Sequence, residues 1–108
     1  MTIFWLRLYE LFWLSAAHFL AEFSLQQAWM VERKKKGDLY ILLGHCLIWT
    51  GALALVLSAF GNLQPWKILF LLLGHMFCDG FKHCLKVPVS DWLDQLFHFI
   101  QILIVLTL

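Results

Sequence analysis

Four histidines and three carboxylates are the residues of this chain whose types and spacing could carry chemistry. In three places a histidine and a carboxylate stand four residues apart, which puts both side chains on one face of a helix. Imidazole and carboxylate groups together suit a divalent transition metal, namely zinc, manganese or iron. We therefore predict a metal site with seven candidate ligands: His18, Glu22, His45, His75, Asp79, Asp94 and His98.

The stretches that carry these residues are long and apolar. The chain has 108 residues, of which 62% are hydrophobic and only 14% are charged, and its mean hydropathy is +0.78. A soluble domain of this size keeps roughly a quarter of its residues charged, because its surface faces water. The composition therefore predicts a single domain with lipid as its solvent.

Four apolar segments are expected to form helices at about residues 3–30, 39–60, 66–86 and 91–108. At about 1.5 Å per residue, each crosses most or all of a ~30 Å hydrocarbon core. The first segment is too long and too charged for a removable signal peptide, so it is expected to stay as the first span. Short connections favour an up-down-up-down path. The predicted fold class is an all-α integral membrane four-helix bundle.

Basic residues gather at the end of this bundle that lies opposite the termini. The positive-inside rule places that end in the cytoplasm of a bacterial inner membrane, with both termini outside. The net charge of +1 gives no reason to expect a nucleic-acid partner, while a second copy or a membrane protein partner stays open. The basic residues at this end are Arg33, Lys34, Lys35, Lys36, Lys82 and Lys86.

The antiparallel path should bring the seven candidate ligands into one layer near the lysine-rich end. An ionisable side chain in hydrocarbon costs roughly 2.5–3.5 kcal/mol, so these groups must face one another, water or a ligand. Gln26, Lys82 and Gln95 extend the same faces and are expected to orient the ligands or to bind an anion. Lys82 has the alternative of extending its ammonium group to the interface.

Several other polar residues fall outside the predicted site. Cys46 and Cys78 neighbour ligand positions but are rotated off the ligand faces, and His83 is rotated in the same way and expected at the interface. Glu10 is expected to pair with Arg7, three residues before it.

With these motifs assembled, the chain resembles a family of small bacterial and phage membrane proteins catalogued as domain of unknown function 3307. The resemblance covers about residues 14–103 and rests on a combination of motifs, with aspartate more common in the family where this chain has Glu22. It implies no established activity. The matching residues are His18, Glu22, Leu25, Gln26, Trp29, Met30, His45, His75, Asp79, Lys82, Asp94, Gln95 and His98.

Three functional hypotheses follow, and no residue is assigned a catalytic role. The leading one is a metal-binding membrane protein, with hydrolysis of a lipid-linked or phosphorylated substrate as its reaction. The second is a small transporter that uses the cluster as a proton or cation path. The third is an accessory subunit whose polar cluster is structural and whose partner lies in the membrane.

Overall fold

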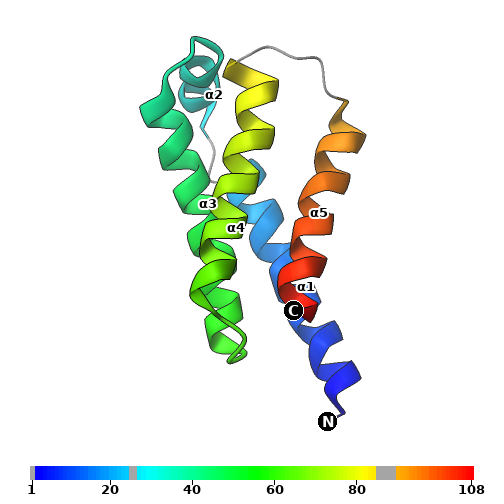
Figure 1. The fold of residues 1–108 in the computed structure, drawn as a ribbon. Helices are drawn as coiled ribbons and strands as arrows, with labels where there is room; N and C mark the ends of the chain where they lie inside the picture. Colours follow the sequence, from blue (N-terminus) through cyan, green and yellow to red (C-terminus); the bar gives the residue numbers. More distant parts are fainter. Residues whose placement is uncertain (1, 25–26, 85–89) are drawn as a thin grey trace.

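The computed structural model describes residues 2–24, 27–84 and 90–108, and every regular element in these ranges is helical (Figure 1). The prediction of an all-α fold is therefore confirmed. The elements in chain order are α1 (Ile3–Phe19), the π-helical segment η1 (Leu20–Ser24), α2 (Ala28–Lys35), α3 (Leu39–Ala59), α4 (Pro65–Asp79), the π-helical segment η2 (Gly80–Cys84) and α5 (Asp91–Thr107).

Four long helices alternate in direction and form an elongated bundle of 47 × 24 × 23 Å. Contacts run from α1 to α3, from α3 to α4, from α4 to α5 and back from α5 to α1, so α1 and α4 lie diagonally opposite. Both termini lie at one end of the bundle, and the short helix α2 lies at the other (Figure 1). We call these the terminal end and the lysine-rich end.

Two of the four expected helices, over residues 3–30 and 66–86, are interrupted in the structure. The segment expected as one helix over residues 3–30 is divided: α1 turns into η1 at Leu20, and α2 is a separate helix that begins after the extended residue Gln27. The segment expected over residues 66–86 likewise changes, where α4 gives way to the wider π form of η2 at Gly80. Such π turns add a residue to the helical turn, and they are frequent at functional sites.

These interruptions matter for membrane crossing. Among the described helices, only α3, with 21 residues, is long and apolar enough to cross a membrane by itself. The apolar stretch Trp92–Thr107 of α5 is shorter. Of the four segments expected to cross a membrane, the described helices therefore support one by length and composition.

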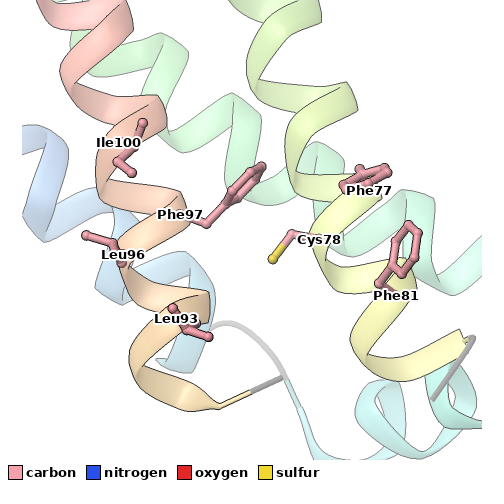
Figure 2. A pocket seen from close by; sticks show the side chains of 7 residues that line it. All are labelled: Phe77, Cys78, Phe81, Leu93, Leu96, Phe97 and Ile100. Carbon is pink, nitrogen blue, oxygen red and sulfur yellow. The ribbon is translucent and has the colours of Figure 1, made fainter. Parts of the chain in front are cut away.

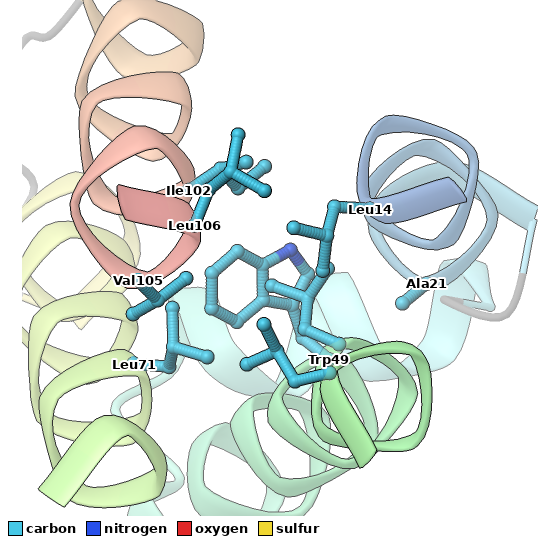
Figure 3. Packing of buried hydrophobic residues seen from close by; sticks show 9 residues of the cluster. Leu14, Ala21, Trp49, Leu71, Ile102, Val105 and Leu106 are labelled. Carbon is cyan, nitrogen blue, oxygen red and sulfur yellow. The ribbon is translucent and has the colours of Figure 1, made fainter. Parts of the chain in front are cut away.

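The apolar core occupies the middle of the bundle around Trp49, whose side chain is fully buried (Figure 3). All of it except Ala21 lies on the terminal side of the histidines: Leu14 precedes His18 by one turn, for example, and Leu71 precedes His75 by one turn. The buried residues of the core are Leu14, Ala21, Trp49, Leu53, Leu57, Leu71, Ile102, Val105 and Leu106.

A second, smaller polar cluster lies at the terminal end. Glu10 is fully buried and pairs with Arg7, as the sequence predicts. Asn62 donates a hydrogen bond to Glu10 at 2.9 Å and another to the carbonyl of Leu106 at 3.1 Å. The buried Lys67 donates to the side-chain oxygen of Asn62 at 2.8 Å. This network ties the loop between α3 and α4 to the end of α5.

Asp38 caps the N-terminus of α3, and its carboxylate makes the stability of the fold depend on pH. Its Oδ1 accepts a hydrogen bond from the Ile41 amide at 3.2 Å, and its Oδ2 lies 2.9 Å from the Arg33 guanidinium. The backbone hydrogen bond from Ile41 and the pairing with Arg33 lower the pKa of Asp38 below its ordinary 3.8. A lowered pKa in the folded state contributes stability above the unfolded value, and that contribution is lost as the pH falls through the folded value.

The substitution Asp38→Asn keeps an N-cap but removes the charge. We expect it to lower thermal stability at neutral pH, and we expect the difference from wild type to shrink as the pH falls below about 4. Thermal unfolding followed by circular dichroism between pH 2 and pH 7 measures this difference. A difference that stays constant over this range would show that the Asp38 charge does not stabilise the fold.

Candidate metal centre

All seven predicted ligands are buried in the half of the bundle toward the lysine-rich end. The four histidines are at most 1% exposed. The three carboxylates, Glu22, Asp79 and Asp94, are 7%, 3% and 4% exposed. The four-residue spacings and the antiparallel path together produce this layer, as the sequence analysis expects.

The first group of ligands joins three elements: η1 carries Glu22, α3 carries His45, and α4 carries His75. The Nε2 atoms of His45 and His75 are 3.2 Å apart. Glu22 Oε2 lies 3.5 Å from His75 Nε2 and 3.9 Å from His45 Nε2. Ligands at 2.0–2.2 Å around a tetrahedral zinc ion are about 3.3–3.6 Å apart. The spacing of these three atoms therefore fits a single metal ion.

Asp79 borders this group and connects it to a lysine that the sequence analysis did not select. Asp79 Oδ2 lies 3.8 Å from His45 Nε2 and 2.6 Å from Lys34 Nζ. Lys34 is fully buried because α2 packs against α3 and η2, which turns its side chain inward. The sequence held no signal for this contact, because Lys34 is one of four consecutive basic residues.

The second group lies between α4 and α5. Asp94 Oδ1 is 3.4 Å from His98 Nε2 and accepts a hydrogen bond from the Cys78 thiol at 2.9 Å. Asp94 Oδ2 is 3.4 Å from Lys82 Nζ. The exclusion of Cys78 from the site is therefore wrong, since Cys78 lies off the Asp79 face but on the side of α4 that meets α5. Cys46, which was excluded for the same reason, lies close to His75 and Asp79 in a further group of possible ligands. Lys82, expected to orient a ligand or to bind an anion, thus contacts the candidate ligand Asp94.

His18 differs from the other three histidines, because an indole N–H and an amide oxygen occupy its two ring nitrogens. Trp49 Nε1 lies 3.0 Å from His18 Nδ1, and an indole N–H can only donate. His18 Nε2 therefore carries the hydrogen and donates it to Gln95 Oε1 at 2.8 Å. In this arrangement His18 has no lone pair left for a metal. Gln95 lies beside a candidate ligand, where the sequence analysis expects a partner.

Trp49 and Gln101 hold the histidine rings from the core side. The Trp49 ring stacks on His75 with centroids 4.3 Å apart and an angle of 14° between planes. Gln101 Oε1 lies 3.4 Å from His98 Nδ1. Predicted residue Gln26 and the side chain of His83 lie outside the described residues.

The two diagonal helices carry the same pattern at the same distance from the core. Leu14, His18 and Glu22 along α1 and η1 correspond to Leu71, His75 and Asp79 along α4, and a π-helical segment starts beside the carboxylate in both. The described cluster contains three carboxylates (Glu22, Asp79, Asp94) and two buried or half-buried lysines (Lys34, Lys82). With all three carboxylates ionised and all histidines neutral, the cluster would carry one net negative charge, which a bound cation offsets.

Comparison with known proteins identifies a family but no described activity. Neither the curated proteins nor the solved structures include a match to this chain. One family, described as "Protein of unknown function (DUF3307)", matches residues 11–108. This match covers all the candidate ligands in both groups, and it agrees with the resemblance noted from the motifs. The chain belongs to the DUF3307 family.

Proposed function

We propose that this protein is an integral membrane protein that binds a divalent transition metal ion through Glu22, His45 and His75. The observation that carries the proposal is the spacing of 3.2–3.9 Å among three buried ligand atoms from three separate elements. Asp79, at 3.8 Å from His45, is close enough to supply a fourth ligand after a small movement. Zinc, manganese and iron all accept this set of nitrogen and oxygen ligands.

The distribution of side chains supports a membrane location. Six charged side chains are buried inside the bundle, while many large apolar residues face outward, among them Leu55 at 74% and Leu73 at 61% exposed. Water-soluble proteins rarely expose contiguous apolar surface of this kind. The 17 residues of α1 and the 5 of η1 form a continuous path of 22 residues, and the 15 of α4 with the 5 of η2 form one of 20. Paths of this length suit a hydrocarbon core of ~30 Å.

The proposed orientation has the lysine-rich end in the cytoplasm of a bacterial inner membrane and the termini outside. Arg33, Lys35 and Lys36 are exposed at that end. The metal ion would then lie within reach of the cytoplasmic interface, where a head group can approach it.

The proposed reaction is hydrolysis of a lipid-linked or phosphorylated substrate. When bound, such an ion supplies a Lewis acid and a hydroxide nucleophile near neutral pH. The chain itself contributes the ammonium group of Lys82, whose side chain is 27% exposed beside Asp94 and can reach an anionic substrate. Trp49 stacks on His75 and fixes the plane of this ligand ring.

A continuous proton or cation path receives less support from the described residues. The core layer between the two polar clusters consists of fully buried apolar side chains, including Leu14, Leu53 and Leu71. A path would need polar groups through this layer. A purely structural cluster in an accessory subunit would leave the fold unaffected by metal removal, which the following experiment measures.

The test is the metal content of the protein purified in detergent without chelators. We expect stoichiometric zinc, manganese or iron in the wild type, and loss of the Glu22–His45–His75 ion in His75→Ala and His45→Ala. His83→Ala is the matched histidine control and should keep that ion. Metal-loaded protein should also release phosphate from a phosphorylated lipid in mixed micelles, and His75→Ala should not. A wild-type protein without stoichiometric metal, whose melting temperature is unchanged by a chelator, would refute the proposal.

A further inference from the structure

Cys78, Asp94 and His98 form a second group of metal-ligating atoms, separate from the Glu22–His45–His75 group. The Cys78 Sγ atom is 2.9 Å from Asp94 Oδ1, and His98 Nε2 is 3.4 Å from the same oxygen. The three side chains come from α4 and α5 and share no member with the first group. A sulfur, an oxygen and a nitrogen ligand together are typical of zinc.

The surroundings of His98 leave the correct nitrogen available for a metal. Gln101 Oε1 lies 3.4 Å from His98 Nδ1, and an amide oxygen can only accept, so Nδ1 carries the hydrogen. Nε2 faces Asp94 Oδ1 at 3.4 Å, and a metal ion bound between these two atoms would take the place of the Nε2 proton. A histidine ligand whose other ring nitrogen donates to a neighbouring acceptor is the common arrangement in metal sites.

The side chain of Gln101 fits against α4 because a glycine there leaves space for it. Its Nε2 lies 3.4 Å from the carbonyl oxygen of Phe70. A Cβ atom built on Gly74 would lie 1.9 Å from Gln101 Nε2, so only glycine leaves room for this side chain. On the other side of the group, Lys82 contacts Asp94 Oδ2 and leaves Oδ1 facing Cys78 and His98. Two of the three ligands therefore have partners that orient them.

The group also has an open side. A groove of about 400 Å³ runs between α4 and α5, and Cys78 is its one residue that is not a large apolar side chain. Figure 2 shows the Cys78 sulfur pointing into the space between the two helices, with Phe97 of α5 across it. Catalytic zinc sites have three protein ligands and keep a fourth position open. Here the fourth position would face the groove.

We propose that Cys78, Asp94 and His98 bind a second divalent cation, zinc, with its open coordination position toward the α4–α5 groove. Binding breaks the S–H bond of Cys78, the thiolate coordinates the ion, and the proton leaves to solvent. The site goes beyond the proposed function, because it involves another ion and a thiolate ligand. Its apolar groove suits a fourth ligand that carries a hydrocarbon chain.

The test uses cobalt(II) as the probe, because thiolate coordination gives cobalt a charge-transfer absorption band in the near ultraviolet. We expect two cobalt ions per wild-type chain together with this band. Cys78→Ala should lose the band and one ion, while Cys84→Ala keeps both. His45→Ala should lose the other ion and keep the band, so the two sites fail separately. A band that survives in Cys78→Ala, or one ion per wild-type chain without the band, would overturn the proposal.

Gly74→Ala provides a second test that leaves all three ligands in place. The new methyl group displaces Gln101, and loss of such an orienting partner typically lowers metal affinity 10–100-fold. We expect that decrease for the ion that gives the thiolate band, measured by cobalt titration. Gly51→Ala is the matched control, since a Cβ there meets no atom within 4 Å. Equal cobalt affinities of the Cys78–Asp94–His98 group in the two variants would exclude the role assigned to Gln101. Binding of the other ion by Glu22, His45 and His75 in Gly74→Ala shows that the variant is folded.

Discussion

Replacing Lys34 with methionine is expected to lower the free energy of unfolding by about 3–5 kcal/mol, the usual cost of breaking a buried ion pair. Lys34 Nζ lies 2.6 Å from Asp79 Oδ2, and both side chains are at most 4% exposed. Methionine has a similar length and keeps the packing, but it leaves Asp79 buried without its cation. Denaturant unfolding in mixed micelles, followed by tryptophan fluorescence, measures the change.

Two further variants separate the charge pair from a general effect of removing a lysine. Lys35→Met changes the neighbouring exposed residue and should shift stability by no more than about 0.5 kcal/mol. The double variant Lys34→Met/Asp79→Leu removes both charges and should recover most of the loss, because a buried pair and an apolar replacement are often close in energy. If Lys34→Met costs no more than Lys35→Met, the buried pair does not stabilise the protein.

The layer of ligands could be predicted from the sequence because it depends on spacing and direction alone. Four residues make about one helical turn, so His75 and Asp79 must share a face whatever surrounds them. Alternating helix directions then set the depth of each pair. Neither step needs knowledge of side-chain contacts, and the structure brings Glu22, His45 and His75 together as expected.

The division of the layer into two groups could not be predicted, because it depends on which helix each face meets. Cys78 is one residue before Asp79 and therefore points about 100° away from it. That direction excludes Cys78 as a ligand only if the layer holds a single site, on the face of α4 that carries Asp79. Once α5 packs beside α4, the same direction brings the Cys78 thiol to Asp94.

The separate helix α2 and the inward position of Lys34 could not be predicted either, because both depend on tertiary packing. The apolar pattern continues through residues 20–30, so it predicts one helix and gives no indication of η1 or of the extended Gln27. Lys34 then appears in a basic run that suggests only an interface. The inward turn of its side chain results from the packing of α2 on α3 and η2, which is a tertiary contact.

Trp49 is the residue whose loss should affect both the core and the metal site. Its buried indole lies in the middle of the apolar core and stacks on His75, and its N–H donates to His18. Trp49→Ala is therefore expected to cost about 3–5 kcal/mol of unfolding free energy through the cavity it leaves. Loss of the stacked ring also frees His75 to rotate, so the affinity of the Glu22–His45–His75 group for zinc should fall about 10–100-fold.

Trp49→Phe distinguishes these contributions, because phenylalanine keeps an aromatic ring beside His75 but has no N–H group. We expect it to cost about 1–3 kcal/mol, mainly because His18 Nδ1 is left buried without its donor, and to keep most of the zinc affinity. Trp92→Ala, at a position that is 70% exposed, is the control and should change neither quantity appreciably. Zinc titration alongside denaturant unfolding gives both values. Equal zinc affinity in Trp49→Ala and wild type would mean that His75 holds its position without the indole, and the ring would then act only through packing.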